Sequence, residues 1–258
     1  MNKELFFFLV CFLTLSYFSS CTKSDEADSS FSALNLEFYE QFSSEGREFV
    51  FFLETHEQFP CSNFLIKTQV NETKEYLEVF AEKIDIPNTC VTSLGPATQK
   101  LVLGKPEIYS KRISFWINDN RHDFHFDVNN STTILKKHNQ FGEQLTFSRD
   151  TLFRLPDNCV WGYIVEQNKN ESNILDELID SFTESGAINH FLAQGDYHFF
   201  RVDDSGNIRF PGIGAGVLTF SVLFDQNLQV LIDIIQEMAP DLQIRMFNTN
   251  GMRYMPEG

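Results

Sequence analysis

Basic residues are scarce in this sequence. Twenty Lys and Arg stand against 36 Asp and Glu, which gives a formal net charge of −16. So acidic a surface repels the phosphate backbones of DNA and RNA, and we therefore exclude nucleic acid as a partner. The common catalytic motifs are missing too: there is no HExxH, no pair of CxxC, no GxSxG and no P-loop. Because no such motif is present, we expect no cofactor.

A hydrophobic run long enough to span a membrane is also missing from the N-terminus. The apolar stretch there covers residues 5–18, whereas a transmembrane helix needs roughly 20 residues. The stretch follows Lys3 and precedes two serines, which is the arrangement of a secretory signal. We predict that residues 1–20 are a signal peptide and that the rest of the protein works outside the cytoplasm.

The end of this signal, Phe-Ser-Ser-Cys (18–21), resembles the lipobox of bacterial lipoproteins. In that family the Cys becomes the first mature residue and carries lipid, so the resemblance implies that Cys21 is acylated and holds the protein on a membrane. Phe18 stands where the family usually has an aliphatic residue. Residues 21–30 are polar and lack apolar periodicity, so we predict a lipidated, flexible tether.

The tether contains a second resemblance, to the short tag by which some Gram-negative lipoproteins reach the outer cell surface. It rests on Lys23, Asp25 and Glu26. The resemblance implies a location at the bacterial outer membrane or the cell surface.

Five cysteines are compatible with export to an oxidising compartment. Cys11 leaves with the signal and Cys21 takes the lipid, so three cysteines remain and three single pairings are open. We favour a Cys61–Cys90 disulfide, because each of the two flanks a strand-like run beside a Pro-containing turn. The alternative is three buried free thiols. Cys159 is the expected leftover and a core residue.

The rest of the chain divides by its hydrophobic pattern. From Glu48 to about Asp150 the sequence shows short runs of alternating apolar and polar residues separated by turns, which predicts an antiparallel β-sandwich-like domain over residues 31–150. Residues 151–258 mix such runs with two amphipathic helical stretches, at 170–186 and 227–239, and with a hairpin around the turn Asp-Asp-Ser-Gly-Asn. We therefore predict a mainly β protein whose C-terminal domain is a small α+β domain with two helices.

One strand carries the residues for a metal-site hypothesis. In the sequence HDFHFDV, alternation places Asp123, His125 and Asp127 on one face and puts His122 with Phe124 on the other. Same-face neighbours lie about 6.8 Å apart, so a third ligand from elsewhere would be needed to complete a site. The plainer interpretation is a strand with an apolar core face and a polar solvent face.

Four further stretches resemble uncharacterised bacterial lipoproteins with a β-rich exported region: FPCSNFLIKTQV, CVTSLGPATQKLVL, LFRLPDNCVWGYIVEQ and LAQGDYHFFRVDDSGNI. The resemblance implies location and fold and brings no site with it. The sequence therefore predicts a lipid-anchored, non-catalytic binding or structural module, with the membrane as one partner and a protein or a carbohydrate as its ligand. The alternative is an exported metal-assisted hydrolase that uses Asp123, His125 and Asp127.

Overall fold

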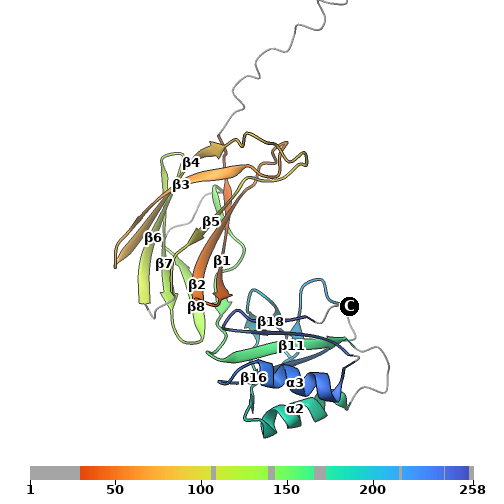
Figure 1. Cartoon of the computed structure of the whole chain (residues 1–258). Helices are drawn as coiled ribbons and strands as arrows, with labels where there is room; N and C mark the ends of the chain where they lie inside the picture. Colours follow the sequence, from red (N-terminus) through yellow and green to blue (C-terminus); the bar gives the residue numbers. More distant parts are fainter. Residues whose placement is uncertain are drawn as a thin grey trace, which may run out of the picture.

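The computed structural model of the chain describes residues 30–105, 109–138, 143–165, 173–214, 217–240 and 242–255. The predicted signal peptide and Cys21 lie outside the described residues, as does the predicted tether up to Ser30. A curled sheet forms one end of the described chain, and a smaller part with two helices forms the other (Figure 1). No helix in these ranges is long and apolar enough to cross a membrane.

The curled sheet has ten strands in the order β10-β8-β7-β6-β4-β3-β5-β2-β1-β9. Neighbouring strands are mostly antiparallel, and the pairs β1–β9, β3–β5 and β4–β6 are parallel. The strands are β1 (Leu34–Ser43), β2 (Gly46–Thr55), β3 (Leu65–Glu72), β4 (Tyr76–Asp85), β5 (Thr98–Val102), β6 (Tyr109–Ile117), β7 (Asn120–Val128), β8 (Thr132–Lys137), β9 (Leu145–Phe147) and β10 (Thr151–Phe153).

Alternation in the sequence decides which face of each strand is buried. In β1, Leu34, Leu36 and Phe38 are buried, and the residues between them are partly exposed. Successive side chains of a strand point to opposite faces, so one apolar face per strand is enough to build a core. The same rule holds in β7, where Phe124 and Phe126 are fully buried.

The sheet curls until its two edge strands approach each other. Three residues, 148–150, separate β9 from β10, and they link the two edges: the Ser148 amide donates to the Leu36 carbonyl in β1 at 3.2 Å, and the Leu135 amide in β8 donates to the Asp150 carbonyl at 2.8 Å. Phenylalanine rings from distant strands therefore meet inside. The Phe126 ring lies 5.1–5.4 Å from three others, those of Phe38, Phe49 and Phe51. The predicted sandwich-like fold is confirmed.

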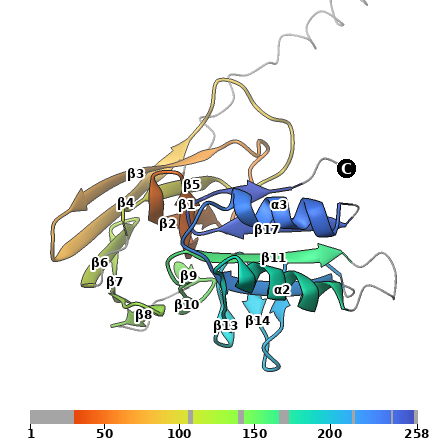
Figure 2. The same cartoon turned by 60° about the horizontal axis from the view of Figure 1, so that its bottom comes forward.

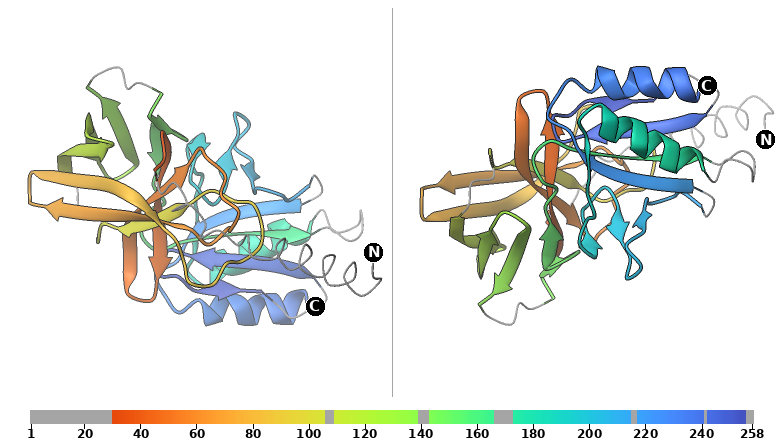
Figure 3. Two further views of the ribbon diagram at one scale, coloured as in Figure 1. Left: turned by 90° about the horizontal axis from the view of Figure 1, so that it is seen from above. Right: turned by 90° about the horizontal axis from the view of Figure 1, so that it is seen from below.

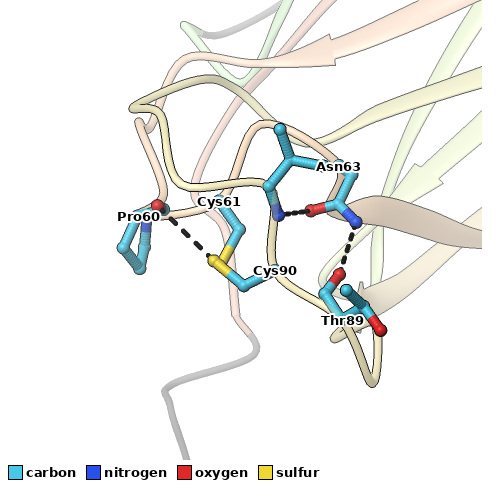
Figure 4. The surroundings of a disulfide bond; sticks show 6 residues. Pro60, Cys61, Asn63, Thr89 and Cys90 are labelled. Atoms are coloured by element: carbon cyan, nitrogen blue, oxygen red, sulfur yellow. Dashed lines mark hydrogen bonds between the residues drawn. A yellow bond between two sulfur atoms is a disulfide. The ribbon is translucent and has the colours of Figure 1, made fainter.

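The Cys61–Cys90 disulfide is present, as the sequence predicts, and Cys159 is free and buried. Asn63 supports the bridge, because its side chain donates to the Thr89 carbonyl at 2.7 Å and accepts from the Val91 amide at 3.0 Å (Figure 4). Closing the loop between Cys61 and Cys90 contributes about 3–4 kcal/mol to stability in the chain-entropy model. The bridge joins the loop after β2 to the loop after β4.

The second sheet has five antiparallel strands in the order β12-β16-β11-β17-β18. Along the chain the elements run β11 (Cys159–Val165), α2 (Ile174–Glu184), β12 (Ile188–Asn189), β16 (Val217–Leu223), α3 (Gln229–Met238), β17 (Gln243–Asn248) and β18 (Arg253–Tyr254). Up to β17 this is the split β-α-β-β-α-β arrangement. The two predicted helices are confirmed and lie side by side on one face of the sheet (Figures 2 and 3).

A small third sheet is inserted between β12 and β16. It consists of β13 (Gly195–Asp196), β14 (Arg201–Val202) and β15 (Ile208–Arg209). This third sheet contacts the curled sheet directly. Gly195 lies so close to the Phe153 ring of β10 that a Cβ added to Gly195 would be 2.1 Å from that ring. The third sheet also packs on the helix-free face of the second sheet, around Trp161. The three sheets therefore converge at one place.

Candidate functional site

The three predicted metal ligands lie where alternation places them. Asp123, His125 and Asp127 are on the outer face of β7 and are partly exposed. His122 is on the inner face and is buried with the phenylalanines of the core.

Asp123 is fully engaged by neighbouring side chains. Its Oδ1 accepts from the Ser114 hydroxyl at 2.6 Å and from Arg121 Nε at 2.9 Å, and its Oδ2 accepts from Arg112 Nη2 at 3.0 Å. Burial acts to raise the pKa of Asp123, but these hydrogen bonds outweigh it and lower that pKa. The charge of this carboxylate is therefore balanced by two guanidinium groups.

Asp127 is engaged in the same way. Lys136 Nζ lies 2.7 Å from its Oδ2, the Ser110 hydroxyl donates to its Oδ1, and the hydrogen bond from Lys136 is the main reason that its pKa is lowered. The His125 ring packs edge-on against the His138 ring, with centroids 4.3 Å apart. Throughout the described ranges, no group of three His, Cys, Asp or Glu side chains is placed to hold a metal ion. The hydrolase hypothesis therefore finds no ligand set on this strand.

A cavity of about 330 Å³ lies where the three sheets converge. Its walls come from β1, from the helix-free face of the second sheet, and from the inserted segment, where Phe199 lies between β13 and β14 and Phe210 follows β15. Most of the lining is aromatic: Tyr39, Phe42, Trp161, Phe199, Phe210 and Phe247. We call this cavity the aromatic pocket. Concave, largely apolar sites with a few polar groups are the usual form of a ligand-binding site.

Trp161 forms the floor of the aromatic pocket. It is 2% exposed, and its ring lies 5.8 Å from Phe42, 5.8 Å from Phe199 and 6.0 Å from Phe247. Alternation along β11 explains its direction: Val160 and Ile164 point to the helices, so Trp161 points to the other face. The surrounding rings, unlike Trp161, are only partly buried.

A turn between β17 and β18 supplies polar groups to the pocket. Asn248 Oδ1 accepts from the amides of Asn250 at 3.1 Å and Met252 at 2.8 Å, which fixes the Asn248 side chain. Gly251 has φ +78°, and a Cβ there would lie 2.5 Å from the Ser43 backbone, so the turn can approach the β1–β2 hairpin only with glycine at this position. The turn is thus held against the curled sheet.

Charged residues gather beside Tyr39 at the pocket wall. The His198 ring stacks on the Tyr39 ring with centroids 4.0 Å apart, and its Nδ1 lies 3.2 Å from Glu37 Oε1. Arg149 bridges Glu37 at 2.6 Å and Asp196 at 2.5 Å. His198 has φ +69°, a left-handed conformation that is uncommon for a residue other than glycine. This cluster connects β1 to the third sheet.

The cluster shifts the pKa of two of its members. The hydrogen bond from His198 lowers the pKa of Glu37, with the Arg149 charge adding to it against the opposing effect of burial. Burial raises the pKa of Tyr39, and the Glu37 charge raises it further. At neutral pH the pocket wall therefore presents an ionised carboxylate behind a neutral phenol.

A second group of ion pairs joins β1 and β2 to the segment that follows β10. Glu40 Oε2 accepts from Arg47 Nη1 at 2.8 Å, and its Oε1 accepts from Arg154 Nε at 2.5 Å. Arg47 also donates to the Leu155 carbonyl at 2.7 Å and to Asp157 at 3.0 Å. Both arginines border a second cavity of about 700 Å³. Because the two arginines are paired with Glu40 and Asp157, we regard this group as structural.

Cys159 does not provide a nucleophile near the aromatic pocket. Burial raises its pKa to about 12, so the thiol stays protonated at neutral pH. The described lining offers aromatic rings, with amide and guanidinium groups at the edge.

The chain was compared with protein-family models, with curated proteins and with solved structures, and none of the three comparisons gives a match.

No motif in the sequence points to the aromatic pocket. Its lining comes from residues 39–42, 161, 199–210 and 247–253, which are far apart in the sequence. One sequence signal for the pocket is the density of aromatic residues in the stretch DYHFF. In the structure the strand is interrupted within this stretch, at His198. Cys21 lies outside the described residues, so its lipidation stays a prediction.

Proposed function

We propose that the protein is a lipid-anchored, extracytoplasmic binding module at the bacterial outer membrane or cell surface. Cys21 attaches it to the membrane, and the aromatic pocket receives the ligand. The observation that carries the binding role is the pocket itself: a cavity of about 330 Å³ lined by partly buried rings. The anchor rests on the signal sequence and on its lipobox resemblance.

The ligand that suits this lining presents a flat apolar face with hydrogen-bonding groups at its rim. A sugar ring and an aromatic side chain of a protein both have this form, and both stack on aromatic rings. Asn248 and Arg253 at the edge of the pocket offer groups for the polar rim.

Tryptophan fluorescence tests the binding role. Trp161 lines the pocket, whereas Trp116 stacks on Phe80 on the outer face of the curled sheet, so the Trp116→Phe variant leaves one reporter at the site. We expect its emission to change on titration with a panel of bacterial oligosaccharides or with a panel of aromatic peptides. The responding panel identifies the ligand class.

Two phenylalanine variants provide the matched comparison. Phe199→Ala removes a ring from the pocket and should weaken binding, whereas Phe191→Ala removes a ring that is 87% exposed and lies outside the pocket. Unchanged affinity in the Phe199→Ala protein would exclude the pocket as the binding site. The anchor has a separate test: labelled palmitate should enter the wild-type protein, and equal incorporation into Cys21→Ala would contradict it.

A further inference from the structure

The end of the curled sheet that lies away from the two helices has an unusual surface. Two regions meet there, residues 58–66 with the start of β3 and residues 86–99 with the start of β5, and neither contains a charged side chain, although Glu57 and Asp85 directly precede them. In the whole chain, by contrast, 22% of residues are charged and the net charge is −16. We call these two regions the uncharged end.

Large apolar side chains are exposed on the uncharged end. The exposed fraction is 49% for Leu65, 45% for Ile86, 55% for Val91 and 78% for Leu94. Exposed apolar side chains that cluster on one surface mark a site of interaction.

Covalent and backbone bonds fix the loop that carries these side chains. The Cys61–Cys90 disulfide joins the two regions, and the backbones of Phe59 and Gly95 exchange hydrogen bonds of 2.7 and 3.1 Å. These bonds hold the backbone at Cys90 and Gly95 against the loop after β2, and Figure 4 shows the disulfide.

The described chain begins at this same end. The Ser32 amide donates to Glu57 Oε1 at 2.7 Å, and the His56 amide donates to the Ala33 carbonyl at 3.2 Å, so the residues before β1 pack beside the loop after β2. Figure 1 shows the start of β1 and the loop between β4 and β5 at one end, with α2 and α3 at the other. The tether predicted from the sequence for residues 21–30 would have a root-mean-square reach of roughly 15–18 Å.

We propose that the uncharged end rests on the lipid bilayer to which Cys21 is attached, with Val91 and Leu94 entering the interfacial region. The inference depends on the proposed lipid anchor. Residues 58–66 and 86–99 themselves carry no ion to desolvate, and their exposed apolar side chains gain from leaving water. They also add no negative charge of their own near an anionic leaflet. The aromatic pocket, at the opposite end of β1, then faces away from the membrane.

Quenching by brominated lipids tests this orientation. The acylated mature protein, from Cys21 onward, is reconstituted in vesicles of phosphatidylethanolamine and phosphatidylglycerol, with or without bromine on the acyl chains. Leu94→Trp places a reporter at the uncharged end, and Ser205→Trp places one in the exposed turn between β14 and β15. The two native tryptophans give the same background in both variants. We expect brominated lipid to remove a larger fraction of the emission from Leu94→Trp than from Ser205→Trp.

Each outcome separates the orientation from the anchor. If mass spectrometry finds Cys21 without lipid in the exported protein, the anchor fails and the inference falls with it. If Cys21 carries lipid and Leu94→Trp is quenched no more than Ser205→Trp, the anchor stands and the orientation is wrong. Leu94 is exposed, so its substitution should leave the fold intact, which far-UV circular dichroism verifies.

Discussion

Replacement of Glu40 by Gln should strongly destabilise the protein. Glu40 is 4% exposed, and its two carboxylate oxygens each accept from a different arginine, Arg47 and Arg154, which are 12% and 7% exposed. Gln has nearly the same shape but no charge, and its amide group would face a guanidinium donor. Arg154 would then lose the Glu40 carboxylate and Arg47 would keep only the exposed Asp157, and removal of one partner from a buried ion pair costs about 3–5 kcal/mol.

Asp157→Asn provides the matched control. Asp157 contacts the same Arg47 at 3.0 Å, but its side chain is 94% exposed. An exposed pair of this kind contributes about 0–1 kcal/mol because water screens it. The two variants therefore remove one carboxylate each from the same guanidinium and differ in burial.

Urea unfolding at neutral pH, followed by circular dichroism with the disulfide intact, measures both variants. A loss of 3–5 kcal/mol corresponds to a melting temperature roughly 6–20 °C lower for a chain of this size. Combination of Glu40→Gln with Arg154→Met should cost less than the sum of the single changes, because the second change removes an unpaired cation. The reasoning is refuted if Glu40→Gln is no less stable than Asp157→Asn.

Three further predictions concern residues at or near the aromatic pocket. The hydrogen bond from His198 is the main reason that the pKa of Glu37 is lowered from 4.5. The ionised carboxylate therefore stabilises the fold above about pH 4.5, and this stabilisation is lost as pH falls through the folded-state pKa. Between pH 6 and pH 3, the unfolding midpoint of Glu37→Gln should fall less than that of the wild-type protein. Gly251→Ala should lose about 2–4 kcal/mol from strain and collision with the β1–β2 hairpin, whereas Gly206→Ala, at φ +83° in open space, should lose only about 1 kcal/mol from strain; equal losses in calorimetry would contradict the collision. Cys159 should resist thiol reagents in the native protein and react on unfolding, and rapid native labelling detected by mass spectrometry would show that its environment is open.

Local periodicity was sufficient for most of the elements. The alternation in HDFHFDV predicts β7 and its buried face, and the apolar positions of 227–239 predict α3. β1 was missed although Leu34, Leu36 and Phe38 alternate in the same way. Its neighbours in the sheet are β2 and the short β9, which lies more than a hundred residues away. A strand signal does not name its partner, so the parallel pairings were beyond the reach of the sequence.

The predicted site residues show the same limit. Alternation places Asp123 and Asp127 on the correct face of β7, but it does not reveal that Arg112, Arg121 and Lys136 neutralise them from β6, β7 and β8. The Cys61–Cys90 bridge was within reach because each cysteine lies in a loop a few residues from a strand. The aromatic pocket was not, since its walls come from β1, from the second sheet and from the inserted segment, which are far apart in the sequence.

What the sequence determines by itself depends on neighbours along the chain: the signal-like N-terminus, the faces of strands and helices, and the absence of charge in 58–66 and 86–99. What the tertiary structure decides depends on segments that are distant in sequence. It places the two uncharged stretches beside the start of β1, and it gathers rings from β1, β11 and the third sheet around Trp161. The physical reason is that the curl of the ten-stranded sheet, which brings these segments together, is driven by burial of phenylalanine rings on its concave face, and no short stretch of sequence encodes that closure.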